Sequence, residues 1–317
     1  MDLLDPHKRK IDYLRISVTD RCNLRCIYCI PKGTSLCRKN SDVLGRDLIL
    51  SFVRSALKHG VKKVRLTGGE PLLRPDIAPL VRGLKALGVQ DVSLTTNGIL
   101  LEKKLPALKK AGLDRVNLSL DTMRPERFRI LTRGGAIGKP FRALELLEEA
   151  GLTPVKINVV PIRGINDDEI PSFAELTRTR PFHIRFIELM PIGNRAWSRE
   201  RLIKSSEAMS IISSALGPLE WKGQEGSSRN YALNGARGLI GFISPESDHF
   251  CGSCNRLRIT AKGKLRPCLF SPFEIDITKA RSEEELEKML LQAVREKPAG
   301  RAADAPLPLA SMSQIGG

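Results

Sequence analysis

The chain has 317 residues, of which 41% are apolar and 27% charged, and its formal net charge is +17. This composition excludes collagen-like, low-complexity and wholly disordered proteins, and the length suggests about two domains. No apolar run approaches the roughly 18 residues of a membrane span, and the first ten residues lack the apolar centre of a signal peptide. We therefore expect a cytoplasmic protein whose positive charge attracts anions such as nucleotides or RNA.

Six short β-type segments follow one another along the first part of the chain, each with a helical pattern after it. They cover residues 12–18, 62–68, 91–97, 115–120, 154–160 and 183–189. The intervening helical patterns carry apolar residues at three- and four-residue spacing and end in glycine. Six βα units with right-handed crossovers predict a parallel sheet that curls toward a barrel, whereas a complete TIM barrel needs eight. We therefore predict an α/β fold with an incomplete (βα)6 TIM-type barrel.

The alternation of predicted strands and helices ends near residue 220. Residues 222–230 are interpreted as a polar linker, residues 256–269 as a hairpin that turns at Lys262 to Lys264, and residues 282–297 as a capped amphipathic helix. From Pro298 onward the composition is typical of a loose tail. We therefore predict two domains: a partial barrel over 1–220 and an α+β domain over 221–317.

Three cysteines, Cys22, Cys26 and Cys29, follow the first predicted strand directly. They could hold an iron–sulfur cluster or, with Cys37 as a fourth ligand, a structural zinc ion. The end of a barrel strand is where such folds place catalysis, and three ligands leave one iron of a cluster open. This position favours the cluster over the zinc site.

A second set of thiols, Cys251, Cys254 and Cys268, surrounds the predicted hairpin, and His249 lies two residues upstream. A zinc ribbon with three thiolates and one imidazole is an alternative. Disulfides are not expected in a chain without a secretory signal. Two incomplete triads favour two clusters, with Cys37 left as a plain loop residue.

Basic residues interrupt four of the apolar strands: Arg15, Arg65, Lys156 and Arg185. The strands of a parallel sheet normally pack apolar residues against the surrounding helices, so these basic side chains are expected to point into the barrel. Four cations there predict an anionic occupant such as a phosphate. For Arg65 the alternative is a solvated charge at the end of a strand.

Small and polar residues lie at the ends of the predicted strands, where ligands of such barrels bind. They are Gly68-Gly69-Glu70, Thr95-Thr96-Asn97, Ser119 with Asp121, and Glu188 with Met190. Glycine permits close approach of a ligand to the backbone, while hydroxyl and amide groups give directional hydrogen bonds. Each motif taken singly is also compatible with ordinary turn chemistry.

Together these motifs resemble a known family. CNLRCIYC after a first strand, followed by LTGGEPLLR, resembles the radical S-adenosylmethionine superfamily. The chain from about Asp12 to Gly317 is similar to the GTP 3′,8-cyclases of molybdenum cofactor biosynthesis through SVTDRCNLRCIYCIP, VRLTGGEPLLR, LTTNG, NLSLD, KINVV with RGINDDE, RFIELMPIGN, CGSCNRLR and the terminal IGG. The resemblance gives no role to Cys37 or to the loop from Gly33 to Asp47.

The resemblance implies a ligand for each cysteine set. Cys22, Cys26 and Cys29 would bind a [4Fe-4S] cluster that holds S-adenosylmethionine, and a second [4Fe-4S] cluster, facing guanine, would be bound by Cys251, Cys254 and Cys268. The implied contacts to S-adenosylmethionine are Tyr28, Gly69, Ser119 and Met190. The implied contacts to GTP are Arg15, Arg65, Thr95, Lys156, Arg256, Leu257 and Arg258, to which we add Arg185. Catalytic roles are expected for Arg256, Arg258, Gly316 and Gly317, with the Gly-Gly end of the tail entering the barrel.

The activity implied by the resemblance is cyclisation of GTP to (8S)-3′,8-cyclo-7,8-dihydroguanosine 5′-triphosphate, the first step of molybdenum cofactor biosynthesis. A 5′-deoxyadenosyl radical would remove the hydrogen from the ribose 3′ carbon, and the resulting carbon radical would add to carbon 8 of guanine. The product would pass to the cyclic pyranopterin monophosphate synthase, and a homodimer is one option. No membrane or nucleic acid partner is expected, and the sequence does not indicate the electron donor.

Two other functions fit part of the pattern. The charge of +17 suits a radical enzyme that modifies RNA, although aromatic residues make up only 5% of the chain. A non-catalytic zinc protein that binds nucleic acid would use the same cysteines. Salt dependence of RNA binding and iron content distinguish these alternatives.

Overall fold

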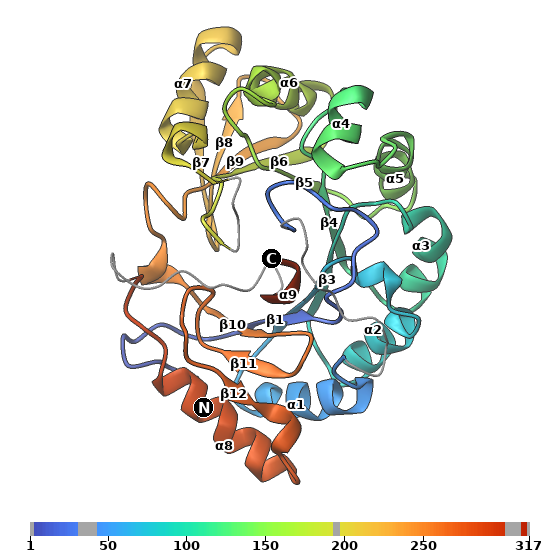
Figure 1. Ribbon diagram of the computed structural model, residues 1–317, viewed down its shortest axis with the longest axis vertical. Coiled ribbons are helices and arrows are strands. Elements are labelled where there is room, and N and C mark those ends of the chain that lie inside the picture. Colours follow the sequence, from blue (N-terminus) through green and yellow to red (C-terminus); the bar gives the residue numbers. More distant parts are fainter. Residues whose placement is uncertain (1–2, 31–42, 193–196, 302–311, 316–317) are drawn as a thin grey trace.

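The computed structural model describes residues 3–30, 43–192, 197–301 and 312–315. Its strands form one twelve-stranded sheet in the order β12-β11-β10-β1-β2-β3-β4-β5-β6-β9-β8-β7 (Figure 1). The strands are β1 (Tyr13–Ser17), β2 (Lys63–Thr67), β3 (Asp91–Thr96), β4 (Arg115–Ser119), β5 (Val155–Val159), β6 (Phe182–Ile187), β7 (Leu219–Glu225), β8 (Ser228–Leu233), β9 (Leu239–Ile243), β10 (Arg256–Ile259), β11 (Lys264–Arg266) and β12 (Ile275–Asp276).

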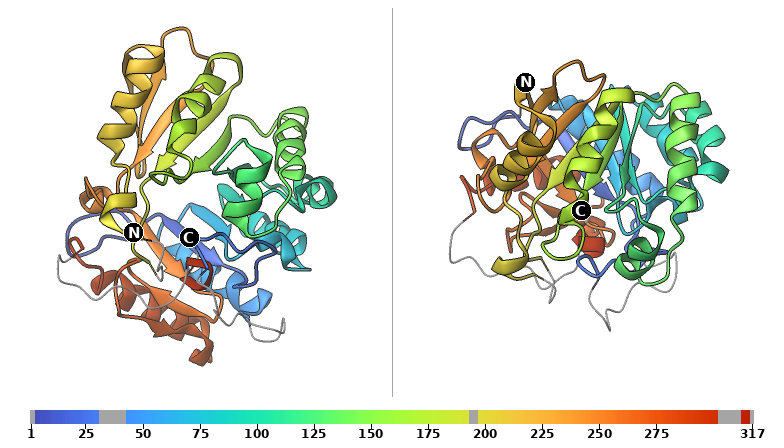
Figure 2. Two further views of the ribbon diagram at one scale, coloured as in Figure 1. Left: turned by 45° about the horizontal axis from the view of Figure 1, so that its top comes forward. Right: turned by 90° about the horizontal axis from the view of Figure 1, so that it is seen from above.

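All the helices except α9 lie outside the curved sheet, and Figure 2 shows the arrangement from two further directions. The α-helices are α1 (Arg46–Lys58), α2 (Ile77–Ala86), α3 (Leu101–Lys110), α4 (Pro125–Thr132), α5 (Gly138–Glu149), α6 (Ile170–Thr179), α7 (Ser205–Leu216), α8 (Glu283–Arg295) and α9 (Met312–Ile315). Within the described residues, no helix is long and apolar enough to cross a membrane.

The six predicted βα strands pair in parallel from β1 to β6, which confirms the incomplete barrel. The structure adds two parallel strands that the sequence did not predict. Strand β10 pairs with β1 at one edge, and β9 pairs with β6 at the other. The C-terminal part of the chain therefore extends both edges of the barrel sheet.

Alternation along the strands separates a helix-facing side from an inner side. In β1, Leu14 and Ile16 are fully buried in the apolar core, and Arg15 points the opposite way. The helices complete the core with large apolar side chains such as Phe52 of α1 and Phe173 of α6. Truncating either phenylalanine to Ala would cost about 3–5 kcal/mol. This core fixes which strand residues reach the inner face.

The C-terminal region corrects one prediction and confirms two. The polar linker predicted at 222–230 is wrong, because β7 and β8 form an antiparallel hairpin with Gly226 and Ser227 between them. The hairpin of β10 and β11 is confirmed. The capped helix is also confirmed, since the side chain of Ser282 accepts a hydrogen bond from the backbone N–H of Glu285 at the start of α8. The sheet continues across residue 220 through the β6–β9 pair, and the domain boundary there stays a prediction.

The tail is ordered where the structure describes it. Residues 312–315 form the short helix α9, which contacts β1 and lies inside the curve of the sheet in Figure 1. Ile315 is 1% exposed and packs against Ile192 and Leu269. The prediction of a loose tail is therefore wrong for these four residues. Gly316 and Gly317 lie outside the described residues, as does Cys37.

Candidate functional site

Cations line the inner face of the sheet in neighbouring strands. Arg258, Arg15 and Arg65 occupy matching register positions on β10, β1 and β2. Burial, then the charge of Arg258, lowers the pKa of Arg15 well below its usual value. Burial, then the charge of Arg256, lowers the pKa of Arg258 to about 10. Such shifts signal a strongly positive, poorly solvated surface that favours an anion.

The four cations predicted to face inward all do so. Arg65 is half-buried: its Nε donates to Ser93 Oγ at 3.3 Å, and its guanidinium lies 5.5 Å from the centre of the Tyr13 ring. The alternative of a solvated strand-end charge is therefore wrong for Arg65. Lys156 on β5 and Arg185 on β6 are 3% and 6% exposed.

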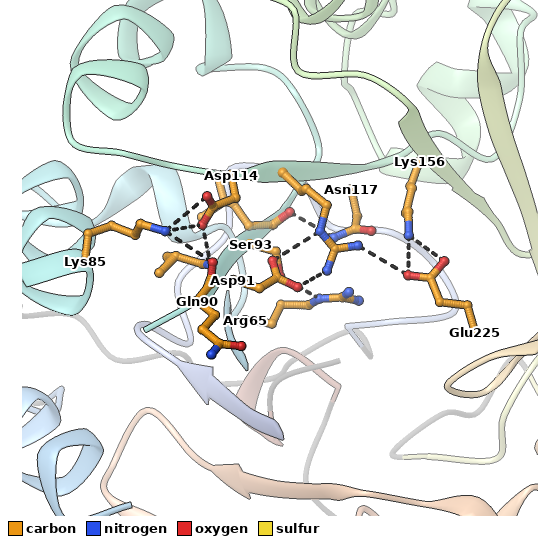
Figure 3. Close-up of polar contacts among 12 residues, drawn as sticks. Arg65, Lys85, Gln90, Asp91, Ser93, Asp114, Asn117, Lys156 and Glu225 are labelled. Atoms are coloured by element: carbon orange, nitrogen blue, oxygen red, sulfur yellow. Dashed lines mark hydrogen bonds and ion pairs between the residues drawn. The ribbon is translucent and has the colours of Figure 1, made fainter. Parts of the chain in front are cut away.

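The chain itself supplies anions to this face, which the sequence analysis did not foresee. Glu225, at the end of β7, accepts from Lys156 Nζ at 2.5 and 2.7 Å (Figure 3). It also accepts from Arg185 Nη2 at 3.0 Å. Arg115 of β4 reaches Glu225 at 3.3 Å and also pairs with Asp91. For Lys156 and Arg185, the expectation that only an external anion compensates the charge is thus corrected. For Arg15 and Arg65 it stays a prediction.

The first cysteine triad lies in the loop after β1, held by its neighbours. Asn97 Nδ2 lies 3.8 Å from Cys22 Sγ, and the backbone N–H of Ser313 in α9 donates to the Cys29 thiol. Burial raises the pKa of Cys22 to about 11 and that of Cys29 to about 12. The thiols are therefore protonated at neutral pH, and ligation of a metal centre would release their protons.

The glycine pair after β2 packs against the backbone of this loop. A Cβ on Gly69 would lie 2.2 Å from the carbonyl oxygen of Arg21, and its backbone N–H donates to Thr19 O at 2.7 Å. Next to it, the buried carboxylate of Glu70 accepts from Thr96 Oγ1 at 2.7 Å and from the Asn97 N–H at 2.8 Å. Burial raises the pKa of Glu70 to about 7. These contacts join the ends of β2 and β3 to the cysteine loop.

The other residues predicted to contact S-adenosylmethionine lie at the same ends of the strands. Tyr28 OH donates to Asp121 Oδ2 at 2.7 Å, and Asp121 Oδ1 accepts from the Val160 N–H at 2.8 Å. Ser119 ends β4 on its inner face, half-buried. Met190 packs with the apolar cluster that includes Ile315 of α9.

Leu257 and Thr95, both predicted to contact GTP, differ in where their side chains lie. Leu257 is fully buried in the core on the helix-facing side of β10, so only its backbone can face a ligand on the inner face. Thr95 Oγ1 is buried and finds no hydrogen-bond partner among the residues that the structure describes, so a ligand oxygen or nitrogen could satisfy it. Glu188 braces the chain between β9 and β10 by accepting from the backbone N–H groups of Glu246 and Ser247, both at 2.9 Å.

The second triad is surrounded by buried cations that sequence analysis did not single out. Lys297 Nζ lies 3.6 Å from Cys254 Sγ and donates to two backbone carbonyls at 2.8 Å. Arg9 donates to Cys251 O at 2.6 Å. Burial alone would raise the pKa of Cys254, but Arg256 and Lys297 lower it to about 6. This cationic setting stabilises a thiolate, the form that ligates iron.

The donor sets suit iron–sulfur clusters chemically, since each offers three free, half-buried thiols. Among the residues that the structure describes, no three His, Cys, Asp or Glu side chains form a site for a single metal ion.

Comparisons with known proteins identify the family and the fold. Residues 16–177 match the model of the radical S-adenosylmethionine superfamily, and residues 182–303 match that of the molybdenum cofactor synthesis C family. The fold is similar to that of Streptococcus suis SuiB bound to S-adenosylmethionine, with a TM-score of 0.65 and 16% identity over 92% of this chain and 66% of that chain. Native anSMEcpe with bound AdoMet gives a TM-score of 0.55 and 16% identity over 88% and 81%. Fold and site together define a radical S-adenosylmethionine protein.

Curated relatives specify the family. The chain is 48% identical to the GTP 3′,8-cyclase of Moorella thermoacetica and 45% identical to that of Thermodesulfovibrio yellowstonii, over 99% of both chains in each case. The relative from Pelotomaculum thermopropionicum is 46% identical over 93% of both chains. The chain belongs to the GTP 3′,8-cyclase family.

Proposed function

We propose that the chain cyclises GTP to (8S)-3′,8-cyclo-7,8-dihydroguanosine 5′-triphosphate, the first step of molybdenum cofactor biosynthesis. The observation that carries this proposal is the row of arginines on the inner face, Arg258, Arg15 and Arg65, in a member of the GTP 3′,8-cyclase family. Guanidinium groups bind phosphate oxygens bidentately, so adjacent guanidiniums suit a triphosphate.

The residues of this chain would bind and orient the substrate. We infer that Arg15, Arg65, Lys156, Arg185, Arg256 and Arg258 hold the phosphates and the base, with Thr95 as a further hydrogen-bond partner. Fixing the ribose against the reactive group removes the entropy cost of orientation from the chemical step. Ser313 of helix α9 contacts Cys29 of the first triad. This contact supports a catalytic role for Gly316 and Gly317, which follow α9 in the sequence.

The cofactors would occupy the two triads. We infer that Cys22, Cys26 and Cys29 hold one [4Fe-4S] cluster with S-adenosylmethionine beside Tyr28, Gly69, Ser119 and Met190, and that Cys251, Cys254 and Cys268 hold a second. When bound, the first cluster and S-adenosylmethionine supply the reductive radical chemistry. The chain contributes the ligands, the buried surroundings and the exclusion of water.

We infer that the chain acts in the cytoplasm and passes its product to another enzyme. Two thiol-ligated clusters suit the reducing cytoplasm. The product would pass to the cyclic pyranopterin monophosphate synthase, and the homodimer remains one option for the assembly.

The test is an anaerobic assay of the whole chain with GTP, S-adenosylmethionine and a reductant. The cyclised triphosphate and 5′-deoxyadenosine should appear in equal amounts by mass spectrometry. Deleting Gly316 and Gly317 should leave folding and iron content intact but strongly reduce cyclisation. Binding of RNA with a steep salt dependence and no turnover of GTP would favour an RNA-modifying enzyme instead.

A further inference from the structure

One carboxylate forms ion pairs with three cations on the inner face. Glu225 contacts Lys156 at 2.5 Å (Figure 3). It also contacts Arg185 at 3.0 Å and Arg115 at 3.3 Å. Three strands of the barrel, β4, β5 and β6, thus present their charges to one residue of the edge hairpin. These contacts are the geometry that a phosphate group between the same cations would also use.

The carboxylate and its partners differ in how firmly they are held. The side chains of Lys156 and Arg185 are 4% and 7% exposed on interior strands, whereas that of Glu225 is 48% exposed. Glu225 is the last residue of β7, the edge strand, directly before the two-residue turn of the hairpin. The cations are therefore fixed parts of the barrel, and the carboxylate is the more easily displaced member of the pair.

The charges depend on one another. Burial, then the charge of Arg185, lowers the pKa of Lys156 to about 8, and the pairing with Glu225 opposes this shift. Burial alone would raise the pKa of Glu225, but Arg185 and Lys156 lower it to about 2. Burying these cations without an anion is energetically costly, so an anion that lies between them is bound favourably.

We propose that Glu225 is a specificity-determining residue that occupies the place of the substrate's phosphates and must be displaced when GTP binds. Because it is tethered, its effective concentration at the cations is high, and small anions compete poorly with it. GTP overcomes this competition because its triphosphate has several charged oxygens and its base is held elsewhere in the site. Glu225 thereby excludes inorganic phosphate and pyrophosphate, and this inference rests on the proposed binding of GTP.

The test compares Glu225→Gln with Glu220→Gln. Glu220 lies on the same strand, is exposed and pairs with Lys222. Its variant therefore controls for the loss of one carboxylate from the hairpin. Glu225→Gln should bind GTP about tenfold more tightly in calorimetry, a difference of about 1.4 kcal/mol. Pyrophosphate should compete with GTP at a concentration about tenfold lower than in the parent chain. Glu220→Gln should match the parent in both measurements.

Unchanged or weaker GTP binding by a folded Glu225→Gln variant would overturn the inference, because it would make Glu225 a structural or positioning group. If that variant does not fold, Glu225→Asp carries the same test. Its shorter side chain keeps the charge but pairs less closely with the cations, so it should bind GTP more tightly than the parent, and unchanged binding would refute the idea. Absence of GTP binding by the parent chain would instead refute the proposed function.

Discussion

Replacing Gly69 by alanine tests how the barrel positions the first cysteine loop. The added Cβ would lie 2.2 Å from the carbonyl oxygen and 2.6 Å from the carbonyl carbon of Arg21, and 2.7 Å from Asp20 O. These distances are well below the roughly 3.5–4.0 Å of a favourable contact. All three atoms belong to the backbone, so no side chain can rotate away. The loop that leads into Cys22 must move or the strand end must distort.

The expected cost of Gly69→Ala is about 1–3 kcal/mol in the free energy of unfolding, the usual range for overpacking. Chemical denaturation of the metal-free chain measures it. The control is Gly138→Ala at the start of α5, where a Cβ meets nothing within 4 Å. That variant should be stabilised by about 0.4–1 kcal/mol through the unfolded chain. Equal stability of the Gly69→Ala variant and the parent would refute the close packing described here.

Three further predictions concern the cations and thiols. The pKa of Lys156 is about 8, so its ammonium group loses its proton as the pH increases above 8. The Kd of GTP, measured by calorimetry, should therefore rise above this pH. The Lys156→Arg variant stays charged and should show a smaller rise. Lys297→Met should cost about 1–3 kcal/mol in urea unfolding, because two buried carbonyls lose their donor; an unchanged midpoint would contradict this. Replacing all three cysteines of one triad by alanine, either Cys22, Cys26 and Cys29 or Cys251, Cys254 and Cys268, should remove about half the iron of anaerobically purified protein. Stoichiometric zinc without iron would argue against both clusters.

The barrel strands could be predicted because their signals are local. β1 to β6 appear in the sequence as short apolar runs separated by helical patterns, and the structure places them within about two residues of the predicted ranges. The parallel pairing of β9 with β6 and of β10 with β1 could not be predicted from such local signals. Nothing within either segment indicates its neighbour, because Leu239 pairs with His183, 56 residues earlier, and Arg256 pairs with Tyr13, 243 residues earlier.

The hairpin error had a local cause. β7 is exposed along most of its length and shows no apolar alternation, so it resembled a linker. The signal that could have identified it is the pair Gly226-Ser227, a dipeptide that suits a two-residue hairpin turn. Because the hairpin was missed, Glu225 was missed with it.

The candidate site was predictable where a charge contradicted its surroundings. Arg15 and Lys156 stood out as cations in apolar strands, and the inner face explains them. Lys297 and Arg9 were not identified, because each is one of several basic residues in a polar segment. Only the tertiary structure brings them to the second triad.

The placement of β9 and β10 has a consequence for how the chain can fold during synthesis. The two strands follow one another in the sequence but complete opposite edges of the parallel sheet. A nascent chain released only as far as residue 220 would therefore carry two unpaired edges, at β1 and at β6. Unpaired edges promote association between chains, and such late, long-range pairing is slow. Emergence of residues 239–259 from the ribosome should be the moment at which both edges become protected, and chaperone dependence should be greatest just before it.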